Sequence, residues 1–145
     1  MNLQEMLLRD RLAREPLRQS EVKRFRDAIG SRLEDARNTS NHNVTRLEQA
    51  YNAILNCAWL ALRVEGYRPK SVPGHHQLVI ESLAETMGID NGDVDYFLEL
   101  AGTRNRDLYD ATPITETDVK EAIEAAANLA EKLERWLDGR GVQAV

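Results

Sequence analysis

The sequence is poor in several residue types, and each shortage excludes a class of protein. A single cysteine, Cys57, cannot form an internal disulfide bond, which fits a reducing intracellular compartment. With only 8 Gly and 4 Pro, the chain is neither collagen-like nor of low complexity. The longest uncharged stretch of the middle of the chain, residues 49–62, is too short and too polar to span a bilayer. The first residues also lack the basic start and apolar run of a signal peptide.

What remains is the composition of one ordinary globular domain. The 145 residues include 42% hydrophobic side chains, enough to close one core but too few for two. We therefore expect a single domain over residues 1–145 with a frayed tail at 140–145. We also expect a soluble cytoplasmic protein that has no membrane partner.

The net charge of −5 conceals two halves of opposite sign. Residues 1–70 carry 13 Lys and Arg against 9 Asp and Glu, whereas residues 71–145 carry 6 against 15. Of the 19 cationic residues, 15 are Arg, the cation suited to bidentate contacts with phosphate or carboxylate. Two interpretations stay open. The basic half either binds an anionic partner, or it lies against the acidic half or against a second copy of the chain.

Apolar residues recur at helical spacing along the whole chain, which predicts an all-α fold. We expect a single-domain antiparallel helical bundle of about five to six helices. The predicted helices span about 2–14, 20–36, 44–65, 75–87, 94–106 and, after a cap at Thr115 or Thr117, the stretch ending at Gly139. Between them, the pattern predicts a loop at 38–43, a linker at 67–74 and a turn at 90–93.

Few residues suggest common enzymatic chemistry. His75 and His76 are adjacent, so they lack the i, i+4 spacing of a helical zinc site, and we expect partly exposed histidines in the cap region of a helix. Cys57 lies in an apolar setting typical of a buried structural thiol. The chain has no phosphate-binding glycine loop, no Gly-x-Ser-x-Gly and no His-Glu-x-x-His. We therefore expect no metal and no cofactor.

One polar segment, residues 102–110, stands apart because it places two Arg, an Asn, two Asp and a Tyr ahead of the last helix. Within it, Arg104-Asn105-x-x-x-Tyr109 precedes a long Ala- and Leu-rich helix. This pattern, together with the stretch from Ala50 to His76, resembles the HEPN superfamily of prokaryotic defence and toxin–antitoxin proteins. The resemblance covers about residues 44–137.

The resemblance implies a two-fold homodimer that brings two copies of the motif together, in many cases as a metal-independent ribonuclease. In such a site a histidine takes a proton from the ribose 2′-hydroxyl and an arginine stabilises the phosphate. Carried over by position, Arg104 matches the arginine, Asn105 the polar residue after it, and Tyr109 stands where the family has histidine. A tyrosine is a poor general base at neutral pH, so the activity of the motif stays open.

A second segment, Arg37 to His42, matches the Arg-Asn-x-x-x-His pattern literally but lies two helices earlier. His42 is either part of a site or a loop residue that caps the next helix. Two interpretations of Arg104 and Arg106 stay open as well. They either bind a ligand, with Asp110 beside them, or pair with Asp107, Asp110 and the acidic last helix.

The leading hypothesis is a HEPN-like domain that binds RNA or a nucleotide-bearing partner. The candidate catalytic residues are Arg104, Asn105 and Tyr109, and the candidate RNA-binding residues are Arg104, Arg106, Asp110, His42 and Arg37. The alternative is a non-catalytic helical module that pairs with a nucleotidyltransferase, an antitoxin-like protein or another effector. A weaker third hypothesis is DNA binding through the basic second helix.

Overall fold

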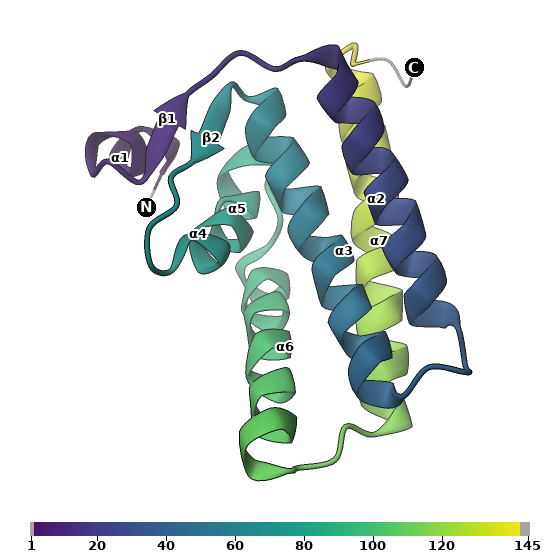
Figure 1. The fold of residues 1–145 in the computed structure, drawn as a ribbon. Coiled ribbons are helices and arrows are strands. Elements are labelled where there is room, and N and C mark those ends of the chain that lie inside the picture. Colours follow the sequence, from purple (N-terminus) through teal and green to yellow (C-terminus); the bar gives the residue numbers. More distant parts are fainter. Residues whose placement is uncertain (1, 143–145) are drawn as a thin grey trace.

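The computed structural model describes residues 2–142 as a bundle of helices with one two-stranded sheet (Figure 1). The prediction of an all-α helical bundle is confirmed. In chain order, the elements are α1 (Leu3–Leu8), β1 (Leu12–Arg14), α2 (Gln19–Arg37), α3 (Asn43–Val64), β2 (Tyr67–Pro69), α4 (His75–Glu81), α5 (Leu83–Thr86), α6 (Asn91–Asp110) and α7 (Glu116–Gly139). None of the described helices is long and apolar enough to cross a membrane.

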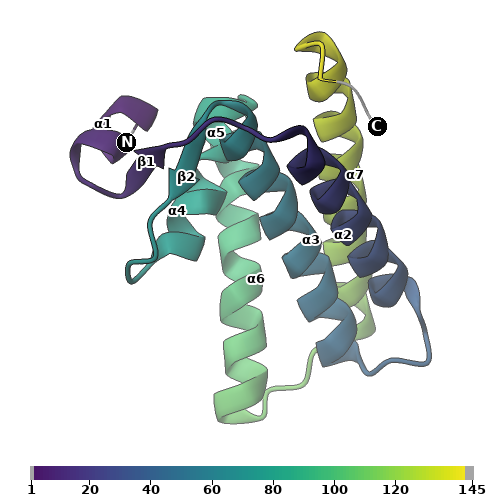
Figure 2. The ribbon, with the colours of Figure 1, turned by 45° about the horizontal axis from the view of Figure 1, so that its top comes forward.

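Helix α3 forms the centre of the core. It packs against α2, α7, α6 and α4, and Figures 1 and 2 show α2 and α6 running antiparallel to it. Twelve of its residues are buried, among them Leu47, Ile54, Leu60 and Leu62, because neighbouring helices cover more than one of its faces. Cys57 is fully buried there, and burial, followed by the charge of Glu134, raises the pKa of its thiol well above the usual range. The burial expected for this cysteine is confirmed.

The predicted helix over residues 2–14 is wrong in its second half. Helix α1 ends at Leu8, and Asp10 takes a left-handed conformation with φ 61°, which turns the chain out of the helix. Leu12 then enters β1, which pairs antiparallel with β2 in the segment expected to be a linker. The side chain of Leu12 is 1% exposed. Leu12 is buried because β1 pairs with a segment more than fifty residues away. Local helical periodicity does not reveal such a pairing.

A buried arginine fastens this sheet to the bundle. Arg63, near the end of α3, donates from Nη1 to the backbone oxygens of Glu15 and Tyr67, at 2.9 and 3.0 Å. Its Nη2 donates to the Pro16 oxygen at 3.0 Å and to Glu21 at 3.1 Å, and its Nε donates to the same carboxylate. The guanidinium therefore replaces the backbone partners that the connection between β1 and α2 would otherwise lack.

Several helix boundaries differ from those predicted. Helix α2 starts at Gln19, with Arg18 rather than Ser20 at its N-cap. The predicted helix over 75–87 is interrupted at Ser82, whose hydroxyl donates to the Val79 oxygen at 2.6 Å. The predicted turn at 90–93 is instead the start of α6, because the Asp90 side chain accepts from the Gly92 N–H at 2.8 Å and caps the helix.

The ends of α7 are well defined. Thr115 caps it and forms a capping box with Asp118, which selects Thr115 over the alternative cap Thr117. After Gly139 the N–H of Val142 donates to the Leu137 oxygen at 3.0 Å, and Gly141 has φ 70°. Residues 140–142 therefore close the helix rather than fray, whereas the rest of the predicted tail, 143–145, lies outside the described residues.

Candidate nucleic-acid interface

The segment that carries the Arg-Asn-x-x-x-Tyr pattern forms the last turns of α6. It was expected to join two helices, but α6 continues to Asp110 and ends where Ala111 turns left-handed at φ 54°. A five-residue spacing on an α-helix separates two side chains by about 140° around the axis. Arg104 and Tyr109 therefore point in different directions, as their exposure confirms: the Arg104 side chain is 34% exposed and Tyr109 is 77% exposed.

Arg104 lies against α3. Its Nη1 stands 3.7 Å from Glu48 Oε1, and its guanidinium carbon lies 5.8 Å from the centre of the Tyr51 ring. Tyr51 is 6% exposed; burial raises its pKa, and the charge of Arg104 lowers it in part. The single carboxylate contact is long and involves only Nη1, so most N–H groups of the guanidinium stay free to bind an anion.

The ion-pair network proposed for this segment does not form among residues 2–142. Arg104 pairs with Glu48 of α3, not with Asp107, Asp110 or the last helix. Arg106 is exposed and donates to the hydroxyl of its neighbour Thr103 at 3.1 Å. Asn105 and Asp110 are exposed as well, so the predicted site residues of α6 other than Arg104 lie on the surface.

The second predicted motif lies at the same end of the bundle but is separate (Figure 1). Arg37 ends α2, and His42 occupies the N-cap position of α3, where its backbone fits but its side chain makes no capping bond. Both residues are exposed. No hydrogen bond or ion pair within residues 2–142 links either one to Arg104, so the structure does not bring the two motifs together as one site.

A cluster of rings that the sequence did not predict as a site lies where α4 meets α3. The rings of His75 and His76 are 4.3 Å apart between centres, and Trp59 of α3 meets them edge-on at 6.1 and 6.3 Å. His75 Nδ1 lies 3.1 Å from the Val72 oxygen. Burial lowers the pKa of His76, and the charges of His75 and Arg104 lower it further, so its neutral imidazole is favoured.

The ring cluster and Arg104 contact the same stripe of α3. Arg104 meets Glu48 and the histidines meet Trp59, eleven residues further along. Eleven residues bring a helix back to within about 20° of the same direction and advance it by about 16 Å. We call this surface, formed by Glu48, Trp59, His75, His76 and Arg104, the α3–α4–α6 face.

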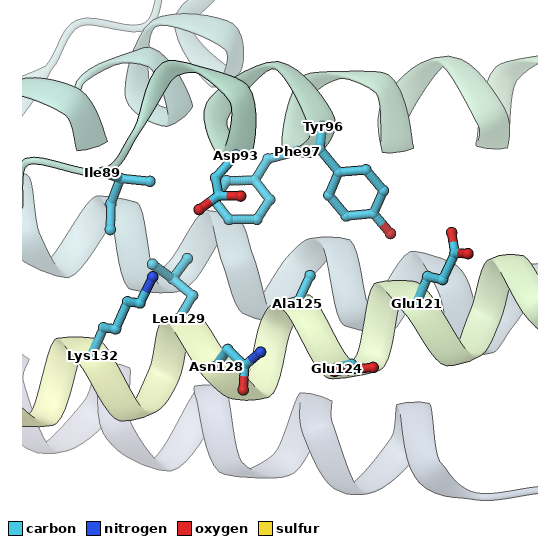
Figure 3. A pocket seen from close by; sticks show the side chains of 10 residues that line it. All are labelled: Ile89, Asp93, Tyr96, Phe97, Glu121, Glu124, Ala125, Asn128, Leu129 and Lys132. Carbon is cyan, nitrogen blue, oxygen red and sulfur yellow. The ribbon is translucent and has the colours of Figure 1, made fainter.

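The first turns of α6, at the other end of the helix from Arg104, border a hollow and acidic region. A cavity of about 230 Å³ lies between α6 and α7 (Figure 3), lined by Ile89, Asp93, Tyr96, Phe97, Glu121, Glu124, Ala125, Asn128, Leu129 and Lys132. Burial raises the pKa of Tyr96 to about 12, and the nearby carboxylates of Glu121, Asp118 and Glu99 add to the effect. A phosphate would be repelled here, so a polyanion would favour the α3–α4–α6 face.

The basic and acidic halves neutralise each other only in part. Among the described residues, one ion pair joins a cation of the basic half to a carboxylate of the acidic half, Arg26 Nε with Glu134 at 2.8 Å. On helix α2, Arg32 donates hydrogen bonds to Asn56 and Gln49, and Lys23 forms an ion pair with Asp27. Much of the basic face expected to bind DNA is therefore engaged within the chain.

No group of three His, Cys, Asp or Glu side chains in residues 2–142 is arranged to hold a metal ion. Comparison with models of protein families, with curated proteins and with solved structures found no match to this chain.

Proposed function

We propose that this chain is a HEPN-like helical module that binds single-stranded RNA on the α3–α4–α6 face. The observation that carries the proposal is the placement of Arg104 and the ring cluster on one stripe of α3. Surfaces that hold single strands combine cations, which follow the backbone, with rings on which bases stack. Arg104 supplies the cation, while Trp59 and the histidines supply the rings.

The HEPN resemblance supports the same assignment from the sequence. It rests on Arg104, Asn105 and Tyr109 ahead of the last helix and implies a homodimer in a defence or toxin–antitoxin setting. The part of the motif that the geometry favours for RNA contact is Arg104. Asn105 and Arg106, both exposed on the same helix, would contact the strand from its edge.

The geometry supports binding more than cleavage. A general base must reach the 2′-hydroxyl while the arginine holds the adjoining phosphate. In one chain, Tyr109 points about 140° away from Arg104 around α6 and lies in solvent. The two residues therefore do not converge on one phosphodiester, and the function we propose is recognition without cleavage.

The proposal is tested with fluorescein-labelled single-stranded RNA and the Arg104→Ala variant. We expect anisotropy to show binding by the native protein and a loss of at least fivefold in affinity for the variant, because a desolvated phosphate contact is removed. Arg135→Ala is the matched control, since Arg135 is exposed on α7 and its loss changes the net charge equally. Equal weakening by both variants would refute the site.

The same incubation, without metal, tests recognition against cleavage. We expect the RNA to remain intact on a denaturing gel. Cleavage by the native protein that disappears in Arg104→Ala would contradict the binding-only function and would instead support the ribonuclease that the resemblance implies.

A second candidate function follows from the end of α6. Leu108 is 67% exposed and Tyr109 is 77% exposed, and such neighbouring apolar side chains are typical of a protein contact. They support the alternative of an interaction module that pairs with a nucleotidyltransferase, an antitoxin-like protein or a second copy. A complex with a co-expressed effector that survives Arg104→Ala but is lost in Leu108→Ser/Tyr109→Ser would favour this alternative.

A further inference from the structure

The segment from the end of α1 through β1 carries arginines that form no ion pair within residues 2–142: Arg9 and Arg14 are exposed and Arg11 is partly exposed. The guanidinium carbon of Arg14 lies 5.4 Å from the centre of the Tyr67 ring, whereas the side chains of Arg9 and Arg11 form no hydrogen bond within the same residues. The two carboxylates of the same stretch are occupied elsewhere: Asp10 pairs with Lys70, and Glu15 pairs with Arg63 and Arg68. This N-terminal arm, residues 9–14, therefore has free positive charge.

The arm is fixed in place beside the α3–α4–α6 face. The N–H of Lys70 donates to the Arg11 oxygen at 2.9 Å, next to the pairing of β1 with β2. Arg11 Nη2 lies 3.6 Å from the position that a Cβ on Gly74 would take, and Gly74 directly precedes His75. Figures 1 and 2 show α1 and β1 projecting from the bundle on the side of α4. The guanidinium of Arg11 thus lies beside Gly74, at the start of the helix that carries His75 and His76.

Charge decides which way a strand bound at Arg104 continues. Beyond Arg104, the end of α6 and the start of α7 carry Asp107, Asp110, Glu116 and Asp118 against the two cations Arg106 and Lys120, so the net charge there repels phosphates. In the other direction, the strand meets Trp59 and the two histidines and then the arm. The favourable path therefore runs from Arg104 across the rings to the arginines.

We propose that the N-terminal arm is a second phosphate-binding element, which holds the backbone of the same RNA strand through Arg9 and Arg11. This inference rests on the proposed function and adds a length requirement to it. Arginine binds phosphate with short, charge-assisted hydrogen bonds and without regard to base sequence. The arm therefore selects strands long enough to reach it from Arg104.

The test uses two labelled uridine RNAs, of about four and about twelve nucleotides, which lie within the range of known single-strand sites. For the longer RNA, we expect Arg9→Ala/Arg11→Ala to lower affinity at least fivefold. We also expect the slope of log affinity against log salt to fall by about 1.4, since each lost contact to a single strand contributes about 0.7. The matched control is Arg24→Ala/Arg135→Ala, which removes the same charge from exposed positions on α2 and α7 and should change affinity less than twofold.

Binding of the shorter RNA distinguishes the contribution of the N-terminal arm from that of the α3–α4–α6 face. It should bind the arm variant as well as the native protein, but bind Arg104→Ala less tightly. If the arm variant and its control weaken the longer RNA equally, or if the arm variant weakens both RNAs alike, the arm inference fails while the proposed function stands. If the native protein binds neither RNA, both fail. The side chains of Arg9 and Arg11 make no hydrogen bonds within residues 2–142, so the variant should fold normally, which circular dichroism checks.

Discussion

At the scale of single residues, the most demanding position is Arg63. Its side chain is 3% exposed and donates hydrogen bonds to Glu21 and to three backbone oxygens at once. A buried charge is tolerated only when its partners are complete, and removing one member of such a set leaves the others desolvated and unpaired. This role could not be predicted from the sequence, because an arginine within a helix is ordinarily an exposed residue.

We predict that Arg63→Met lowers the free energy of unfolding by about 3 kcal/mol or more, measured by urea denaturation near pH 7. Lys23→Met is the control, because the Lys23–Asp27 pair is more than 60% exposed on both sides and should contribute less than about 1 kcal/mol. Similar losses in the two variants would contradict the role assigned to Arg63.

The same pair predicts a pH dependence. The hydrogen bond from Arg63 holds the pKa of Glu21 below its ordinary value of 4.5, against the opposing effect of burial. A carboxyl whose pKa is depressed by folding stabilises the native state above its unfolded pKa and loses that contribution as the pH falls through the folded value. The stability difference between native protein and Arg63→Met should therefore be constant above about pH 6 and shrink below pH 4.5.

At the scale of helices and strands, what the sequence could predict was local. The spacing of Val119, Ala126, Leu129 and Leu133 predicted α7, and Gly and polar runs located most connections. The largest error arose where a distant segment decides the structure, since β1 exists because β2 pairs with it, whereas the boundary errors at Ser82 and Asp90 have local causes. The candidate site shows the same limit, since Arg104 was identified from its motif, whereas its neighbours Glu48 and Tyr51 come from α3 and its packing.

Glycine in the middle of a helix gives a prediction at this scale. Gly30 lies inside α2, where an added Cβ would meet no atom within 4 Å. We predict that Gly30→Ala raises the free energy of unfolding by about 0.5–1 kcal/mol, because alanine restricts the unfolded chain and its methyl group costs nothing in the fold. Thermal or urea unfolding of the purified variant measures the change.

Gly88 provides the matched comparison. It has equal space around a Cβ, but its φ is 65°, in the region that side chains other than glycine rarely adopt. Gly88→Ala should therefore lower stability while Gly30→Ala raises it. A change of the same sign in both variants would show that backbone conformation is not what separates the two positions.

At the scale of the whole molecule, regions of opposite charge lie at the two ends of α6. Its first turns line the cavity with Asp93, near Glu121 and Glu124 of α7, whereas Arg104, near its end, contacts Glu48 of α3. The end of the same helix exposes Leu108 and Tyr109. A net charge of −5 makes two copies repel each other at long range, although the apolar helix end favours contact. RNA binding and self-association should then respond to salt in opposite ways.

We predict that raising the salt concentration from about 0.1 to about 0.5 M weakens RNA binding at least tenfold, because released counterions no longer favour the complex. Sedimentation of the protein alone over the same range should show self-association that is unchanged or stronger, since salt screens the repulsion between acidic copies and leaves apolar contacts intact. Leu108→Ser/Tyr109→Ser should shift the protein toward the monomer at every salt concentration. Self-association that weakens with salt, as RNA binding does, would mean that ion pairs rather than the apolar end of α6 join the copies, and the homodimer would then have to form through the basic and acidic halves instead.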